Sequence, residues 1–409
     1  MLGVSAPPTE LSRALAAHAR PLGVPDDLPD GEPTEEGLAA WVRAARGARV
    51  VALGPAVGGT RELAALAGRC VEELVADAGA GVGTLALQAA ESGTTVLDDH
   101  VRQGTGNAGG FGEALQGLGS WSWHTREVLD VVRALASRGG VRVVGIDPRR
   151  PAPAVRVVGA FLRAAAPDAL PPVADGLADL ALGYGDGEGT RAAVEQVRER
   201  LARDVPALVA ATSPTRHAEA VRHAGFLARA AELAATPPER AEAVAARLMA
   251  DAVLDALDSQ DQGDRLVLWA HADHVVVREQ TLGAHLRERL GDGYRTLVLS
   301  AGTGTVRATR RRRLFGPTRT PATHRLGEVP ASSLEGVLLD ALPRDAVLDL
   351  RDPAVPPAVT AWAGEATVRR SVGDEVSAAA PARATVPCVP GTELDGVAVV
   401  RAVHPARAL

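Results

Sequence analysis

The fold of this chain is decided by residues 50–62, which read Val-Val-Ala-Leu-Gly-Pro-Ala-Val-Gly-Gly-Thr-Arg-Glu. The first four residues form a continuous apolar run, as expected for a strand that is covered on both faces. Gly54, Gly58 and Gly59 predict a tight turn. Thr60 then suits a helix N-cap, and Glu62 is favourably placed in the first helical turn. This stretch therefore predicts a buried strand, a glycine turn and a helix in succession.

The same pattern recurs along the chain. Short apolar runs bounded by Gly or Asp occur at residues 84–87, 141–146, 266–269, 296–299, 347–350 and 397–403. Amphipathic helical patterns occur at residues 61–77, 125–137 and 283–290. Strands that alternate with helices predict an α/β fold, in which a parallel-dominated central sheet is flanked by helices.

A proline-rich stretch at residues 148–153 interrupts this rhythm. Residues 154–258 then read almost entirely as helix, which is long enough for a helical subdomain packed beside the sheet. We therefore expect an N-terminal helical segment (1–45), an α/β core domain (46–150 and 259–409) and an inserted helical subdomain (151–258).

The composition excludes several classes of function. The chain has 409 residues, 46% of them hydrophobic, and a net charge of −6, which fits a globular protein with a sizeable core. All 44 basic residues are arginine, so Schiff-base catalysis and Walker-type phosphate binding, which both need lysine, are excluded. The mild negative charge gives no case for nucleic acid as a partner. No signal-peptide pattern and no apolar run near ~18 residues occurs, which predicts a cytoplasmic protein without membrane contact.

Glycines and polar residues follow four of the predicted strands. They are the turn at residues 54–59, Gln88, Asp147 and the pair His271 and His274. In an open α/β sheet, sites form at the carboxyl ends of the strands, where the loops converge. If the strands are parallel neighbours, we expect these four segments to meet in one cleft. The turn either exposes N–H groups that hold an anion, although its proline lacks one, or simply needs the freedom of glycine.

Short motifs across most of the chain resemble one protein family. Residues 54–62 resemble the pattern Gly-Glu-x-x-His-Gly-Thr-Arg-Glu of the erythromycin esterase-like family. Further matches follow in the family's order: Trp-Ser-Trp-His-Thr-Arg-Glu-Val at 121–128, Gly-Ile-Asp at 145–147, Arg-Leu-Met-Ala at 247–250, Trp-Ala-His-Ala-Asp-His-Val at 269–275, and the runs at 348–351 and 394–397. Each motif is weak alone, and their order and spacing carry the resemblance.

The resemblance implies a small-molecule site whose usual chemical groups are missing. The family has Glu and His where this chain has Pro55 and Gly58, and a third carboxylate where it has Gln88. Glutamine donates and accepts hydrogen bonds but cannot carry a proton away. The family's activation of water therefore has no base at these positions.

These matches define the candidate site residues. For proton transfer and charge stabilisation we expect His271, His274, Arg61 and His100, since imidazole titrates near neutral pH and guanidinium grips carboxylates and oxyanions. His100 equally suits a surface histidine. For substrate binding, the resemblance implies Gly58, Gly59, Glu62, Gln88, Trp123, Glu127, Asp147 and Arg247. The histidine spacing differs from the helical His-Glu-x-x-His of zinc hydrolases, so we predict no metal and no cofactor.

Other patterns carry less information. Residues 104–109 match Gly-x-Gly-x-x-Gly by letter but follow a helical pattern, and no Gly-x-Ser-x-Gly occurs. Cys70 lies on an apolar helical stripe, and Cys388 is assigned no role. The arginine-rich run at residues 307–313 suits a solvated loop. Alternatively, it overhangs the cleft and attracts an anionic substrate or a carrier protein.

Three functions remain open. The first is an enzyme of natural-product metabolism that acts on a small molecule by proton transfer, such as cyclisation, elimination or isomerisation, rather than by ester hydrolysis. The second is a non-catalytic descendant that binds a ligand or a protein partner. The third is an esterase whose base has moved to His100.

Overall fold

The structure is a computed structural model that describes residues 9–22, 37–77, 81–104, 108–183, 187–259, 265–312, 316–317, 320–377 and 384–409. Of the N-terminal segment expected at residues 1–45, the described part contains the helices α1 (Glu10–His18) and α2 (Gly37–Ala45). Residues 1–8 and 23–36 of that segment lie outside the described residues.

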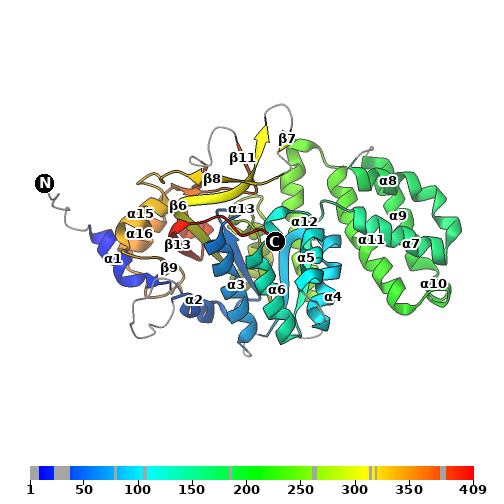
Figure 1. The fold of residues 1–409 in the computed structure, drawn as a ribbon, viewed down its shortest axis with the longest axis horizontal. Coiled ribbons are helices and arrows are strands. Elements are labelled where there is room, and N and C mark those ends of the chain that lie inside the picture. Colours follow the sequence, from blue (N-terminus) through cyan, green and yellow to red (C-terminus); the bar gives the residue numbers. More distant parts are fainter. Residues whose placement is uncertain are drawn as a thin grey trace.

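A mostly parallel sheet forms the centre of the fold (Figure 1). Its strands follow the order β1-β9-β13-β6-β2-β5-β3-β4. Neighbouring strands from β13 to β4 are parallel, whereas β9 and β1 add antiparallel at one edge. The predicted α/β class with a parallel-dominated sheet is confirmed. The strands are β1 (Arg20–Pro21), β2 (Val50–Pro55), β3 (Val82–Ala90), β4 (Arg142–Asp147), β5 (Arg265–Trp269), β6 (Tyr294–Arg312), β7 (Gly316–Pro317), β8 (Ala322–Leu326), β9 (Ala346–Asp349), β10 (Thr367–Arg370), β11 (Glu375–Ser377), β12 (Thr385–Cys388) and β13 (Gly396–Val403).

Helices cover both faces of this sheet, which explains the continuous apolar runs. Leu53 and Leu87 pack in one hydrophobic cluster with α3 (Arg61–Ala76) and α6 (Arg126–Arg138), which lie in front of the sheet in Figure 1. Val50 and Ala86, on the same two strands, pack in another cluster with α12 (Pro238–Asp258) and α14 (Leu282–Leu290). Because successive strand side chains point to opposite faces, a strand between two helical layers is apolar at every position.

The helices of the α/β part and of the helical stretch are bounded as follows. They are α3 (Arg61–Ala76), α4 (Thr95–Gln103), α5 (Ala108–Gly117), α6 (Arg126–Arg138), α7 (Ala152–Ala165), α8 (Ala174–Leu182), α9 (Gly187–Arg203), α10 (Val205–Ala211), α11 (Pro214–Ala234), α12 (Pro238–Asp258), α13 (Ala272–Val275), α14 (Leu282–Leu290), α15 (Leu334–Ala341), α16 (Pro357–Ala363) and α17 (Pro390–Glu393). A third apolar cluster joins α1, α15 and α16 to β9 and β13.

Helices α7 to α11 form a lobe beside the sheet, at the right of Figure 1. Their apolar side chains make a cluster of their own. Helix α12 follows them in the chain but packs Met249 and Val253 against the sheet. Arg229 of α11 ties the lobe to the rest of the fold, because it pairs with Glu91, just after β3, at 2.6 Å and with Asp255 of α12 at 2.8 Å. The boundaries of the expected domains stay a prediction.

Strand β6 is much longer than the apolar run at residues 296–299 that predicted it. It continues to Arg312 and pairs there with β7, β8 and β11, above the main sheet in Figure 1. In this second half, Val306 and Ala308 are buried, whereas Thr305 and Arg307 are only half-buried. Such alternation is the signature of a strand with one covered face, which a search for continuous apolar runs does not detect.

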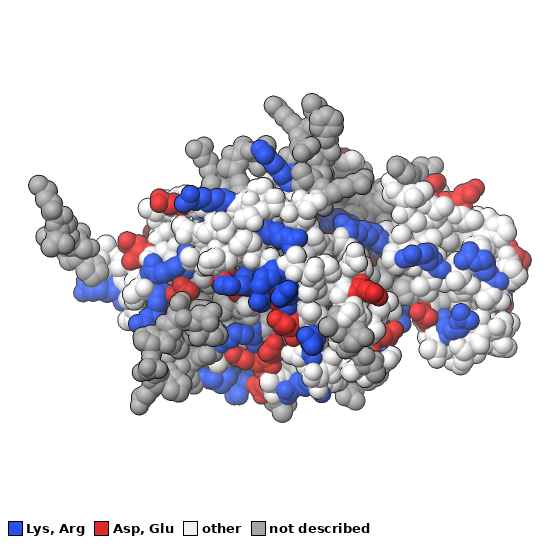
Figure 2. Space-filling model, in the orientation of Figure 1, with Lys and Arg blue, Asp and Glu red and all other residues white. Residues whose placement is uncertain are grey.

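Acidic and basic side chains are interspersed over the face of the molecule shown in Figure 2. Such a mixture of signs limits long-range attraction of a partner of one charge. None of the helices in the described ranges has the length and apolar character needed to cross a bilayer.

Candidate functional site

A cavity of about 790 Å³ lies where the strands of the sheet end. Gly58 and Gly59 line it from the turn after β2, and Gln88 from the end of β3. Asp147 is the last residue of β4, and His271 follows β5. Both line the cavity together with His274. The four segments expected to meet at the carboxyl ends of the strands do so.

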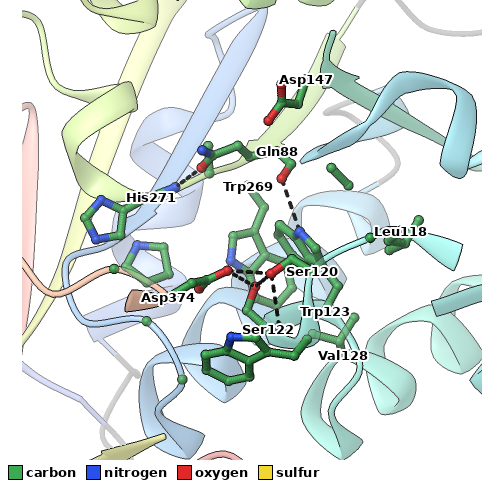
Figure 3. A pocket seen from close by; sticks show the side chains of 18 of the residues that line it. Gln88, Leu118, Ser120, Ser122, Trp123, Val128, Asp147, Trp269, His271 and Asp374 are labelled. Atoms are coloured by element: carbon green, nitrogen blue, oxygen red, sulfur yellow. Dashed lines mark hydrogen bonds between the residues drawn. The ribbon is translucent and has the colours of Figure 1, made fainter. Parts of the chain in front are cut away.

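Gln88 connects two walls of the cavity (Figure 3). Its side-chain Oε1 accepts a hydrogen bond from the backbone N–H of His271 at 2.8 Å. Its backbone carbonyl accepts one from the indole Nε1 of Trp123 at 3.1 Å. Trp123 in turn packs edge-on against Trp269, with 5.5 Å between the ring centroids. The amide of Gln88 therefore fixes the backbone after β5, and the two tryptophans form a rigid apolar wall.

Both ring nitrogens of His271 bond to backbone atoms. Nδ1 accepts from the N–H of Asp273 at 3.2 Å, so the proton of the neutral ring is assigned to Nε2, which donates to the carbonyl of Val372 at 3.3 Å. Burial by itself would favour neutral Asp273, but His271 and Arg369 outweigh it and lower the pKa of that carboxyl. His271 thus pins the segment around Val372 to the end of β5.

His274 is a neutral imidazole at the cavity wall. Burial, followed by the nearby His271, lowers its pKa to about 4. Among the described residues, its ring has no hydrogen-bond partner, whereas its backbone N–H donates to the carbonyl of His271 at 2.9 Å. The ring is therefore available to donate a hydrogen bond to a ligand or to accept one.

Backbone contacts hold the glycine turn against β6 and two other segments. Gly59 has φ +64°, and a Cβ there would lie 1.9 Å from the carbonyl oxygen of Arg307 in β6. The Gly59 carbonyl accepts from the N–H groups of Arg307 (3.0 Å) and Ala406 (2.9 Å). The N–H of Gly58 donates to Val372 at 2.7 Å. Because that amide already has a partner inside the protein, the turn does not expose it to an anion.

Sequence reasoning missed an acidic side chain in the cavity, that of Asp374. Its Oδ2 accepts hydrogen bonds from the hydroxyls of Ser120 at 2.5 Å and Ser122 at 2.8 Å (Figure 3). Its backbone carbonyl accepts from both the N–H and the hydroxyl of Thr309, each at 2.9 Å. A Cβ on Gly58 would lie 3.4 Å from Asp374 Oδ1, so this carboxylate stands beside the turn. No signal pointed to it, since Asp374 follows no predicted strand.

Comparisons with known proteins identify the family. The family model described as erythromycin esterase matches residues 79–403. The chain belongs to the erythromycin esterase family. The resemblance drawn from the short motifs is thereby confirmed, and no curated protein matches the chain.

Three solved structures of similar fold cover nearly the whole chain. A protein from Bacillus cereus is 19% identical, covers 98% of this chain with 100% of its own, and has a TM-score of 0.77. A succinoglycan biosynthesis protein is 17% identical, covers 97% of each chain, and also has a TM-score of 0.77. A mutant of the erythromycin esterase EreC in its open conformation is 16% identical, covers 95% of this chain and 98% of its own, and has a TM-score of 0.69. At these identities the likeness shows the fold alone.

Three residues that the family pattern assigned to the site lie elsewhere. Arg61, Glu62 and Glu127 line a second depression, of about 380 Å³, between α3 and α6. Arg61 pairs with Glu62 at 3.1 Å, and Glu62 accepts from the backbone N–H of His404 at 2.7 Å. The buried carboxylate of Glu127 pairs with the guanidinium of Arg407, with 2.8 Å between Oε1 and Nε. These groups hold the C-terminal segment against α3 and α6, which corrects their expected place in the cavity.

Arg247 and His100 are also outside the cavity lining. Arg247 pairs along and beside α12, with Asp251 at 2.7 Å and with Glu232. His100 lies on α4 and packs edge-on against Phe111, with 5.7 Å between centroids. An esterase whose base is His100 therefore has no geometric support.

The remaining sequence patterns do not add to the site. Cys70 and Cys388 are buried, and burial raises the pKa of the Cys388 thiol to about 12. In the described ranges, no group of three or more His, Cys, Asp or Glu side chains is arranged to hold a metal ion. Residues 105–107 of the glycine motif and Arg313 of the arginine run lie outside the described residues. The beginning of that run forms part of β6, where Arg307 stacks on Trp121 at 5.6 Å.

Proposed function

We propose that this family member is an enzyme that binds a small organic molecule in the cavity and moves protons on it, instead of activating water to hydrolyse an ester. One observation carries the proposal. A carboxylate, Asp374, and a neutral imidazole, His274, line the same cavity, while the family's Glu, His and Glu positions hold Pro55, Gly58 and Gln88. A natural-product-like substrate is in keeping with the family name and with the erythromycin esterase among the similar structures.

Hydrolysis by the family's usual route lacks a base. None of the side chains at the three altered positions can accept a proton, and the Gln88 Oε1 is already bonded to the N–H of His271. General-base catalysis contributes about 10²–10⁴-fold to a rate. The family's arrangement of groups around the water is therefore missing, and the acid that we assign as base, Asp374, belongs to a different segment.

Asp374 is the proposed base. Two serine hydroxyls hold its Oδ2, and Oδ1 stands next to Gly58, where the family pattern places a histidine. The donors fix the orientation of the carboxylate before the substrate binds. A small molecule against the glycine turn would then present a C–H or O–H group to this oxygen.

His274 is the proposed electrophilic partner. Because its pKa is about 4, the ring is neutral near pH 7 and can donate one N–H to a substrate carbonyl. A carboxylate base with a neutral imidazole donor is the division of labour used in isomerisation through an enolate. Asp374 takes the proton next to the carbonyl while His274 steadies the oxygen. The proton then returns to another carbon in an isomerisation, or a leaving group departs in an elimination.

His271 has a positioning role in this proposal. Its two ring nitrogens hold the backbone at Asp273 and Val372, and Val372 lies two residues before Asp374. Acting as a base would require His271 to break one of these bonds. We therefore expect His271 to place Asp374 rather than to transfer the proton itself.

The test is a substrate panel of lactones, esters and hydroxyketones, read by mass spectrometry. We expect products of unchanged mass or products that have lost one water, with kcat lowered about 10²–10⁴-fold in both Asp374→Asn and His274→Asn. Asp99→Asn, which removes an exposed acid on α4 outside the cavity, should leave the rate unchanged. Products that have gained one water would refute the proposal, and so would rates insensitive to Asp374→Asn.

A second candidate is a non-catalytic protein that binds a ligand in the same cavity. The observation in its favour is that the Gly58 N–H and both ring nitrogens of His271 are already bonded within the protein. This candidate would be favoured if panel compounds bind without turnover and if Asp374→Asn binds the same compounds as the wild type.

A further inference from the structure

One cavity residue has an unusual backbone. Arg150 follows the end of β4 and lines the cavity, and its φ is +66°. Gln280 is the other non-glycine residue with positive φ in the described part of the chain. An L-residue is strained in this left-handed region, and such strain gathers at functional sites. A glycine would fit position 150 at no cost, so the side chain is retained against the preference of the backbone.

Gly119 lies directly against the side chain of Arg150. Gly119 has φ +87°, and a Cβ there would lie 2.5 Å from Nη1 of Arg150 and 2.9 Å from its Cδ. The arginine therefore lies directly on the Gly119 backbone, whose positive φ favours glycine. Gly119 lines the cavity beside Ser120, one of the two serines that hold Asp374. Arg150 is exposed, and its side chain runs over the backbone of Gly119, next to Ser120.

The two arginines of the cavity lining differ in their partners. Arg149 is neutralised by Asp147 at 3.4 Å and by Glu242 at 3.0 Å. Among the described residues, no carboxylate pairs with Arg150, and no acceptor bonds to its guanidinium. Asp374 lines the same cavity, and the serines hold its Oδ2. Helix α7 begins directly after Arg150, with no acidic residue in its first turn, and its end adds positive potential.

We propose that Arg150 is the binding residue for an anionic group, a carboxylate or a phosphate, on the substrate. The planar guanidinium offers parallel N–H donors that match either anion. This inference rests on the proposed function, since it names the substrate class of the same cavity. A charged group held at Arg150 would orient the rest of the molecule between Asp374 and His274.

The experiment measures equilibrium binding without turnover. Three probes are titrated against the fluorescence of the cavity tryptophans: phenylacetate, phenyl phosphate and the neutral phenylacetamide. At least one anion should bind the wild type about tenfold more tightly than the amide, the gain expected for a charge-assisted contact. The anion that binds more tightly shows whether the site prefers carboxylate or phosphate.

Two substitutions at the same position separate binding from stability. Arg150→Gln and Arg150→Gly should both abolish the preference for the anion. Arg150→Gly should in addition melt at a higher temperature than the wild type, because glycine accepts φ +66°. Arg156→Gln, which removes an exposed positive charge on α7 away from the lining, is the matched control and should keep the preference.

Equal affinity of the wild type for anion and amide, no measurable anion binding, or an unchanged preference in Arg150→Gln would each overturn the inference. Asp374→Asn should keep the preference for the anion, since it leaves Arg150 in place. A lost preference in Arg150→Gln without turnover on any panel compound would uphold this inference and sink the proposed function. Turnover that depends on Asp374, without any preference for the anion, would support the proposed function and overturn this inference.

Discussion

Replacing Gly59 by alanine tests whether the glycine turn is a structural joint between β2 and β6. Gly59 has φ +64°, a conformation that alanine rarely adopts. The added Cβ would also lie 1.9 Å from the Arg307 carbonyl oxygen and 2.7 Å from the ring of Trp121. The tryptophan can shift slightly, but the carbonyl belongs to the backbone of β6.

The cost can be worked out in two parts. The left-handed conformation costs alanine about 1 kcal/mol. The Arg307 carbonyl must retreat by about 1 Å, because protein interiors have no slack at such contacts. That shift breaks the hydrogen bond from Arg307 N–H to the Gly59 carbonyl, at 3.0 Å, which is worth about 1 kcal/mol. It also loosens the packing around the carbonyl, which costs about 1 kcal/mol more. We expect Gly59→Ala to lower the free energy of unfolding by about 3 kcal/mol in all.

Gly183→Ala is the matched control for thermal unfolding of the two variants. Gly183 ends α8 with φ +71°, and a Cβ there meets nothing within 4 Å, so only the backbone term of about 1 kcal/mol applies. The difference between the variants, about 2 kcal/mol, isolates the clash with β6. If Gly59→Ala is no less stable than Gly183→Ala, the close approach of β6 to the turn does not exist and the shape of the cavity is wrong.

Two further predictions concern buried side chains. Trp123→Phe should destabilise the protein by about 1 kcal/mol more than Trp121→Phe in thermal unfolding. The reason is that Trp123 Nε1 bonds to Gln88, whereas Trp121 Nε1 is buried with no partner in the described part of the chain. Equal losses would contradict the assigned bond. His223 is 1% exposed, and neither ring nitrogen has a hydrogen-bond partner among the residues that the structure describes. Burial lowers its pKa from 6.5 to about 4. Between these two pH values His223 is protonated in the unfolded chain but neutral in the folded chain. Its contribution therefore lowers the free energy of unfolding by about 3 kcal/mol as the pH drops from about 6.5 to about 4. Unfolding of His223→Leu at pH ~7.5 and ~4.5 should show this acid loss reduced, and an identical pH dependence in both proteins would disprove the assignment.

Local sequence patterns predicted the central sheet well. The run at residues 50–53 became β2, and the runs at 84–87, 141–146 and 266–269 became the neighbouring strands. These strands lie between two helical layers, so every position is apolar and the signal is continuous. The second half of β6 and the short strands β8, β10, β11 and β12 went unpredicted, since they lack such runs.

Part of the cavity was accessible from the sequence for the same reason. Gln88, Asp147, His271 and His274 follow strands whose parallel arrangement carries their ends to one edge. The family pattern placed residues in the cavity less successfully where those residues lie on helices. Glu62 lies one position beyond Arg61 on α3 and turns to the backbone of His404, a residue 342 positions away in sequence.

By itself, the sequence determined the α/β class, the order of the central elements and the edge of the sheet at which a site forms. These depend on local periodicity and on glycine, both of which act within a few residues. Only the tertiary structure showed that Asp374 enters the cavity. Asp374 meets Ser120 across 254 positions, and a hydrogen bond between such distant residues has no local pattern, because the folded backbone alone brings them together.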